Sequence, residues 1–328
     1  MTSTPDVGLL RRLSRICDRD GLIRTAAIDH PENYDLLFDD DLAKVSFAEV
    51  VDSKLELIEA MSGHASSLLL DPRASLGQAI VSGAAPGDVG ILSGLEALYY
   101  TPDTGGFEPR LALKDGWGPE RLAELGVDAA KLVVFHRHLD QESVAEKVEI
   151  VADVARRCHD LHLPLVVEPL WYPAAGEDPR DPAIRAQRTE SVIASAGIFK
   201  AAGADIMKVE FPVDLATEAE SADDATERLA QACAGTWVLL SAGVTFDGFI
   251  EQVKVGVRHG CSGFMAGRAI WGDGVGRFDD ERRAAGVRTA CERLDKLTEV
   301  LHTHPHPAVT HLPRAEAPDV IGPNWYAG

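Results

Sequence analysis

The chain has 328 residues, 45% of them hydrophobic, so it can bury a large core in one or two domains. A net charge of −20 argues against nucleic acid or an anionic membrane as a partner. No apolar run approaches the roughly 20 residues of a membrane span, and the N-terminus lacks a signal-peptide core, so we expect a cytoplasmic protein. The five cysteines are odd in number and widely spaced, which argues against a disulfide framework and against a metal-binding CxxC.

A short amphipathic helix is expected over residues 9–16, and Asp20-Gly21 closes it because glycine suits the position after a helix end. A strand-then-helix alternation follows, with Gly or Pro between the segments. Eight apolar runs are expected to be strands: 23–28, 65–70, 89–92, 131–135, 163–167, 206–211, 237–240 and 263–266. Helical patterns lie at 47–61, 119–125, 142–161, 189–202, 225–234 and 246–259.

Short strands that alternate with helices indicate a parallel sheet buried on both faces. Eight such units in roughly 250 residues favour a closed (β/α)8 barrel over an open doubly wound sheet, and no GxGxxG follows the first strand. We therefore predict an α/β protein with a single TIM-barrel domain over residues 1–300, which begins with the short N-terminal helix. A Pro- and His-rich tail is predicted over 301–328, with Trp325 and Tyr326 packed on the barrel or on a neighbouring subunit.

Polar side chains occur where the predicted strands end, and the carboxyl ends of barrel strands form the active site in this fold. Acidic residues at strand ends are also common as helix caps, so Asp71 and Glu96 are weaker candidates than the two strand lysines. The polar residues at or near the strand ends are Asp29, Asp71, Glu96, Lys131, Arg137, Glu168, Lys208, Ser241 and Arg268.

Lys208 lies inside the apolar run 206–211, where period-two alternation places it on one face with Ile206 and Glu210. Burying an amine costs several kcal/mol unless it is paired or neutral. One interpretation is a structural Lys208–Glu210 ion pair. The other is a nucleophile, whose pKa would have to fall by about three units from roughly 10.4 to give a free amine near pH 7. Burial and the like charge of Lys131 would supply that shift.

Four segments in order, within about residues 20–275, resemble the class I, Schiff-base aldolases of the DeoC/LacD family, which includes tagatose-1,6-bisphosphate and sulfofructosephosphate aldolases. The resemblance implies that Lys208 is the Schiff-base lysine and Lys131 the second strand lysine. It also implies that Glu168 is the acid–base glutamate and that Asp29 is the aspartate of the first strand. The family needs no cofactor, and no strand-end cluster here offers three convergent metal ligands.

Two turns resemble the family segments that hold an anionic head group: Ser241-Ala242-Gly243 and Gly267-Arg268. Backbone N–H groups ahead of a helix, with an arginine fork, suit a phosphate. The alternative is that the glycines only permit tight turns and that Arg268 is a solvated surface residue.

The sequence departs from the family at His30-Pro31, where Gln-Arg is usual, and at the bulky run 170–172. Loss of that cation weakens the case for a second phosphate on the substrate, unless Arg137 or Arg180 replaces it.

The sequence thus predicts a metal-independent aldolase that cleaves a ketose phosphate, tagatose-bisphosphate-like or sulfofructose-phosphate-like, to dihydroxyacetone phosphate and an aldehyde. A homo-oligomer is possible, and the sugar and its stereochemistry stay open. One alternative is another Schiff-base enzyme of the transaldolase or dehydratase type. The other is a non-catalytic barrel that binds sugar phosphates. The joint presence of Asp29, Lys131, Glu168 and Lys208 argues against it, since binding alone needs no amine in a strand.

Overall fold

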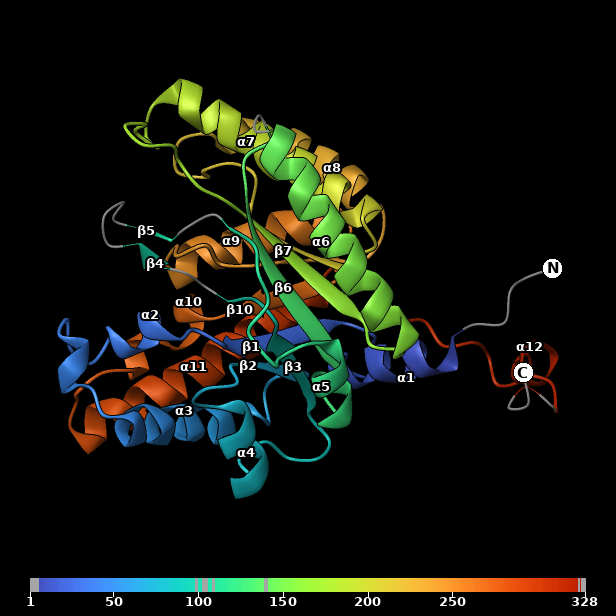
Figure 1. The fold of residues 1–328 in the computed structure, drawn as a ribbon, viewed down its shortest axis with the longest axis horizontal. Coiled ribbons are helices and arrows are strands. Elements are labelled where there is room, and N and C mark those ends of the chain that lie inside the picture. Colours follow the sequence, from blue (N-terminus) through green and yellow to red (C-terminus); the bar gives the residue numbers. More distant parts are fainter. Residues whose placement is uncertain are drawn as a thin grey trace.

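The computed structural model describes residues 6–97, 100–101, 106–107, 110–138, 141–323 and 325. Eight parallel strands close into a barrel in the order β1-β2-β3-β6-β7-β8-β9-β10, which confirms the predicted TIM barrel (Figure 1). A small antiparallel pair, β4 (Tyr100–Thr101) and β5 (Gly106–Phe107), lies in the connection between β3 and β6. The barrel strands are β1 (Ile23–Ile28), β2 (Ser67–Leu70), β3 (Gly90–Gly94), β6 (Ala129–His136), β7 (Leu165–Trp171), β8 (Ile206–Val209), β9 (Trp237–Leu239) and β10 (Gly263–Ala266).

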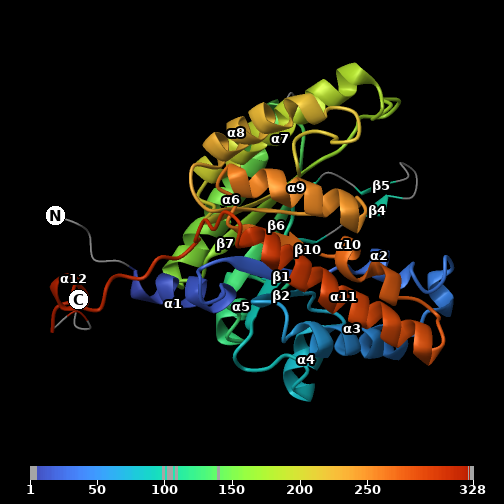
Figure 2. The same ribbon diagram turned by 180° about the vertical axis from the view of Figure 1, so that it is seen from behind.

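Helices surround the barrel in two groups that Figures 1 and 2 show on opposite sides, α6, α7 and α8 on one and α3, α4 and α11 on the other. The longer helices are α1 (Val7–Ile16), α3 (Phe47–Met61), α6 (Gln141–Asp160), α7 (Pro182–Ala201), α8 (Ala222–Cys233), α9 (Phe246–Arg258) and α11 (Asp280–Leu301). The shorter ones are α2 (Glu32–Asp35), α4 (Leu76–Ser82), α5 (Pro119–Glu124), α10 (Arg268–Trp271) and α12 (Ala317–Val320), with 3-10 turns at Leu42–Lys44, Ala219–Ser221 and Gly272–Gly274.

The barrel interior is a separate apolar cluster, because alternate residues of each strand point inward. On β8, Ile206 belongs to the inner cluster, while Met207 and Val209 pack in the outer core against the helices. Lys208 therefore shares the inward face, as the alternation predicts. The inner cluster consists of Ile16, Ile23, Ala27, Leu69, Leu92, Ala129, Val166, Ile206, Val238 and Met265.

The amino-terminal end of the barrel is closed by α1 and by part of the C-terminal tail. Ile16 is fully buried in the inner cluster, and its carbonyl accepts a hydrogen bond from the Ser66 hydroxyl. Ala308 packs on the same cluster and donates its N–H to the Gly21 carbonyl. Figures 1 and 2 place α2, α10 and the β4–β5 pair at the other end of the barrel, where the strands finish.

Several element boundaries differ from the predicted ones. Helix α7 begins at Pro182, earlier than the expected 189–202, because the Asp181 side chain caps it and proline suits the first helical position. Helices α4 and α11 have no counterpart among the expected ones. Trp325 is 54% exposed, while Tyr326 lies outside the described residues. Across the described part of the chain, no helix is long and apolar enough to cross a membrane.

Candidate active site

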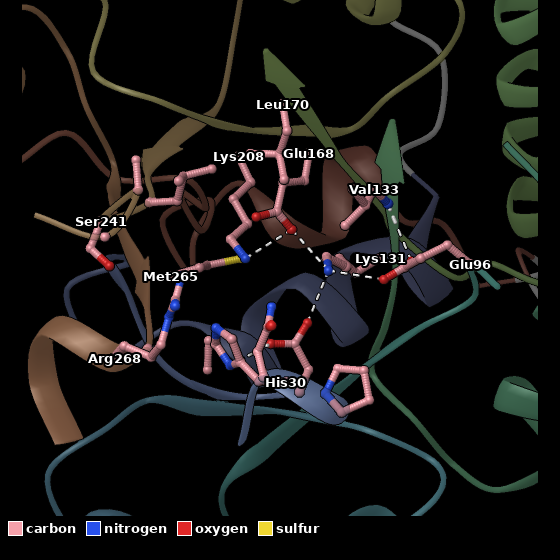
Figure 3. Close-up of a pocket in the computed structure, with 18 of the residues that line it drawn as sticks. His30, Glu96, Lys131, Val133, Glu168, Leu170, Lys208, Ser241, Met265 and Arg268 are labelled. Carbon is pink, nitrogen blue, oxygen red and sulfur yellow. Dashed lines mark hydrogen bonds and ion pairs between the residues drawn. The ribbon is translucent and has the colours of Figure 1, made fainter. Parts of the chain in front are cut away.

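A cavity of about 240 Å³ opens at the carboxyl ends of the barrel strands (Figure 3). Its walls come from β1, β6, β7, β8 and β10 and from the segments that follow β1, β3, β9 and β10. The residues that the family resemblance and the two turns assign to the site all line this cavity. They are Asp29, Lys131, Glu168, Lys208, Ser241, Ala242, Gly243, Gly267 and Arg268.

Lys131 is held by three carboxylates at the base of the cavity. Its Nζ lies 2.9 Å from Asp29 Oδ2, 3.1 Å from Glu96 Oε1 and 2.9 Å from Glu168 Oε2. Only 3% of Lys131 is exposed, so these contacts satisfy a buried ammonium that would otherwise be costly. The arrangement fixes Lys131 as a cation.

Glu168 joins the two lysines, as Figure 3 shows. Its Oε2 atom lies 3.0 Å from Lys208 Nζ as well as 2.9 Å from Lys131 Nζ. Among the described residues, Lys208 forms an ion pair with this one carboxylate, which it shares. The amine of Lys208 is buried beside a carboxylate that could take up its proton and lines the cavity, an arrangement that suits nucleophilic catalysis by lysine.

Burial and the neighbouring charges shift the pKa values of this cluster in opposite directions. For Lys131, burial would lower the pKa, but attraction to Asp29, Glu168 and Glu96 outweighs it and raises the pKa well above the usual value. For Asp29 and Glu168, burial would raise the pKa, but the charges of Lys131 and Lys208 hold both pKa values below the usual range. Both carboxyl groups are therefore ionised at neutral pH.

The structural ion pair considered for Lys208 does not form. Glu210 instead accepts hydrogen bonds from Arg188 at 3.1 Å and from the backbone N–H of Trp171 at 2.8 Å. Glu210 thus holds the loop after β7, and Lys208 turns to Glu168 in the cavity.

The two weaker acidic candidates have different outcomes. Asp71 does not line the cavity: it caps its own turn by accepting from the N–H groups of Arg73 and Ala74, and it pairs with the buried Lys54. Glu96 does reach the site, where one oxygen contacts Lys131 and the other accepts from the backbone N–H of Val133 at 3.2 Å. Glu96 is therefore a third carboxylate of the cluster.

The turn after β9 brings polar backbone to the rim of the cavity. Ala242 and Gly243 have φ values of 45° and 79°, in the left-handed region that glycine adopts readily. Ser241 is buried and lines the cavity, and α9 begins shortly after the turn. Backbone N–H groups at this rim can bind an anion.

The turn after β10 needs glycine for space. A Cβ at Gly267 would lie 2.5 Å from His30 Cε1 and 2.8 Å from the Ala27 carbonyl oxygen. Arg268 follows, exposed to solvent but lining the cavity on the same side as Ser241.

His30 is a site residue that the sequence does not predict, since His30-Pro31 stands out there only as the replacement of the family's Gln-Arg. The His30 ring lines the cavity and lies edge-on to Trp271. Burial, with the charges of Arg268 and the lysines, lowers the pKa of His30 to about 4 despite Asp29.

The wall formed by β6 and β7 is apolar, with Val133, Phe135 and Leu170 facing the cavity. Neither arginine considered for a second anion lines it. Arg137 pairs with both oxygens of Glu177, at 2.6 and 2.9 Å, and the exposed Arg180 pairs with Asp178. The cationic side chains among the described residues of the lining are Lys131, Lys208 and Arg268. Within the same described part, no group of three His, Cys, Asp or Glu residues could hold a metal ion.

Known proteins resemble the chain in both sequence and fold. Tagatose 1,6-diphosphate aldolase 1 of Enterococcus faecalis is 26% identical over 310 residues, which cover 89% of this chain and 94% of that protein. Tagatose 1,6-diphosphate aldolase 2 of Streptococcus mutans is 25% identical over 316 residues, covering 90% and 94%.

Solved structures share the fold at lower identity. An archaeal fructose 1,6-bisphosphate aldolase matches with a TM-score of 0.59 at 18% identity, covering 89% of this chain and 99% of that one. Fructose-bisphosphate aldolase from Plasmodium falciparum matches with a TM-score of 0.65 at 16% identity, covering 91% and 95%. The family model described as DeoC/LacD family aldolase matches residues 26–273. Because this match spans most of the chain, the protein belongs to the DeoC/LacD family of aldolases, as its strand-end residues suggested.

Proposed function

We propose that the protein is a cytoplasmic class I aldolase that cleaves a ketose 1-phosphate to dihydroxyacetone phosphate and an aldehyde through a Schiff base on Lys208. The observation that carries the proposal is the unequal pairing of the two buried lysines. Lys131 contacts three carboxylates, whereas Lys208 contacts only Glu168 among the described residues and shares it. Lys208 can therefore give up its proton with the smaller loss of ion pairing, and it is the amine that can attack a carbonyl.

The cluster supplies the proton transfers of the reaction. Lys208 first passes the proton of its ammonium group to Glu168, 3.0 Å away, and its free amine attacks C2 of the ketose while Glu168 gives that proton to the carbonyl oxygen. The nitrogen of the resulting carbinolamine then loses a second proton to Glu168. Glu168 then protonates the departing hydroxyl of the carbinolamine, which leaves as water and gives an iminium ion. The iminium accepts the electron pair of the C3–C4 bond when Asp29 takes the proton of the C4 hydroxyl. The resulting enamine is protonated at C3, and water hydrolyses the Schiff base to release dihydroxyacetone phosphate.

The phosphate of the ketose would occupy the rim formed by the turns after β9 and β10. The left-handed backbone at Ala242 and Gly243 and the side chain of Arg268 border the same side of the cavity. A phosphate on C1 at this rim leaves C2 to lie over Lys208. This placement accounts for an arginine at the mouth of a protein with a net charge of −20.

The far end of the substrate would face the apolar wall of β6 and β7. The curated relatives are named for a 1,6-diphosphate, but here Arg137 is already occupied by Glu177 and the cavity offers Val133, Phe135 and Leu170. We therefore propose that a second phosphate adds little, and that monophosphates are cleaved about as well as 1,6-bisphosphates.

Initial rates of dihydroxyacetone phosphate release from tagatose and fructose 1-phosphates and from the matching 1,6-bisphosphates test this proposal. We expect kcat/KM values for each pair to agree within about tenfold, or roughly 1.4 kcal/mol. Arg180→Ala, which removes an exposed arginine paired with Asp178, is the matched control for Arg137→Ala. A preference for bisphosphates above about a hundredfold in kcat/KM, lost in Arg137→Ala, would refute the proposal that monophosphates are cleaved about as well. No release from any ketose phosphate would refute the function.

A further inference from the structure

Lys54, on the outer side of the barrel in α3, is fully buried yet plays no part in the reaction described above. Its ammonium group has three donors, and each has an acceptor. Nζ lies 2.5 Å from Asp71 Oδ2, 2.9 Å from the His30 carbonyl oxygen and 3.3 Å from the Ile28 carbonyl oxygen. The ring of Tyr34 covers the group, with its centroid 4.8 Å from Nζ.

The two carbonyl groups belong to the residues on either side of Asp29. The pairing of β1 with β2 ends at Ile28 opposite Leu70, so the chain leaves the sheet just before Asp29. Lys54 binds the backbone on both sides of this point. The direction of the Asp29 side chain, and its 2.9 Å contact with Lys131, depend on that backbone.

Asp71 gives Lys54 a rigid anchor. One Asp71 oxygen accepts from the N–H groups of Arg73 and Ala74, at 2.9 and 2.8 Å, and the other accepts from the Ser75 hydroxyl at 2.8 Å. The carboxylate is therefore fixed by its own turn before it meets Lys54. Since this turn follows β2, the anchor belongs to the barrel itself.

We propose that Lys54, anchored by Asp71, is a positioning residue that sets the place of Asp29 in the reaction. The inference rests on the proposed function. A purely structural role explains the pair less well, because well-packed apolar residues often replace a buried ion pair without loss of stability. Apolar side chains at these positions would leave the carbonyls of Ile28 and His30 without their donor, and the backbone around Asp29 would be free to shift.

The test removes both charges together, so that neither is left buried and unpaired. In Lys54→Met with Asp71→Asn, the asparagine oxygen still accepts from Arg73 and Ala74. We expect kcat for cleavage to fall about 10- to 100-fold, the range for a displaced catalytic group, with KM changed less than about threefold. Lys200→Met is the matched control: Lys200 also donates to two backbone carbonyls, those of Ala204 and Asp205, but ahead of β8. Its kcat should stay within about twofold of wild type.

A double-mutant cycle separates positioning from stability. If Lys54 acts through Asp29, the Lys54→Met/Asp71→Asn changes should lower kcat by less than about twofold further in an Asp29→Asn background, because coupled residues are not additive. A full, multiplicative loss in that background would overturn the inference, as would an unchanged kcat in the otherwise wild-type protein. If the combined variant does not fold, Lys54→Met alone is carried through the same cycle, because Asp71 keeps its hydrogen bonds from Arg73, Ala74 and Ser75 in that variant. A loss of about 3- to 10-fold in kcat is then expected, with the same non-additivity required. Wild-type cleavage is measured first, so that a failure of the proposed function is seen independently of the cycle.

Discussion

Replacing Glu168 by glutamine keeps the shape of the side chain and removes the charge between the two lysines. The variant loses the ion pairs at 2.9 Å to Lys131 and 3.0 Å to Lys208, and it loses the group to which we assign proton transfer to and from the carbinolamine. General acid–base catalysis contributes about 10²- to 10⁴-fold, so we expect kcat to fall by that factor. The same factor should appear in the rate at which borohydride traps dihydroxyacetone phosphate, because Glu168 acts before the iminium forms.

The stability of this variant should fall as well. Lys131 keeps its contacts with Asp29 and Glu96, but the buried Lys208 loses the one carboxylate with which it forms an ion pair among the described residues. We expect a loss of about 3–5 kcal/mol in unfolding free energy, the cost of removing the sole partner of a buried charge.

Steady-state cleavage and urea unfolding measure the two effects. Glu190→Gln is the control, because Glu190 pairs with Arg228 on the surface, where a salt bridge contributes about 0–1 kcal/mol. A Glu168→Gln enzyme that keeps kcat within about threefold of wild type would refute the acid–base assignment, whatever its stability.

Three further outcomes are expected. Arg268→Ala should raise KM about 10- to 100-fold with little change in kcat, since the phosphate contact persists from ground state to transition state; a matching fall in kcat would contradict this. His30 has a pKa of about 4 in the folded protein against 6.5 ordinarily, so the unfolded chain binds more protons between these values and stability is lost as pH falls through them. Urea unfolding at pH 7 and pH 5 measures this: between the two pH values, the unfolding free energy of His30→Gln should fall by about 2 kcal/mol less than that of the wild type. Equal losses in the wild type and the variant would contradict the prediction. Activity should survive EDTA, because the proposed mechanism uses the iminium on Lys208 as its electron sink; loss on chelation that zinc restores would point to a metal-dependent aldolase.

The barrel and the inward direction of Lys208 could be predicted from the sequence, because strand periodicity and strand ends are local signals. Ile206 lies in the inner cluster and Met207 in the outer core, in agreement with that alternation. The partner of Lys208 was less accessible. Glu210 has the right sequence spacing, but Arg188, on a helix that follows another strand, takes it, and Glu168 approaches from the neighbouring strand.

Asp71 and Glu96 show where local patterns stop being informative. Both are acidic and follow a strand, yet Asp71 turns away to Lys54 while Glu96 reaches Lys131. The difference lies in tertiary neighbours: α3 places Lys54 beside Asp71, and the Val133 N–H on β6 holds Glu96 over the cavity. Lys54 itself looks like an ordinary lysine in an amphipathic helix, and its burial appears only in the folded chain.

The most direct test of the account is the identity of the lysine that forms the Schiff base. The enzyme is incubated with dihydroxyacetone phosphate, reduced with borohydride, and its peptides are analysed by mass spectrometry. We predict irreversible addition of one ligand on the peptide that contains Lys208, and none in Lys208→Met, while Lys131→Met is labelled more slowly because Lys131 only supports the cluster. Modification on Lys131 in the wild-type enzyme, or no modification at all, would contradict the assignment of Lys208 as the nucleophile.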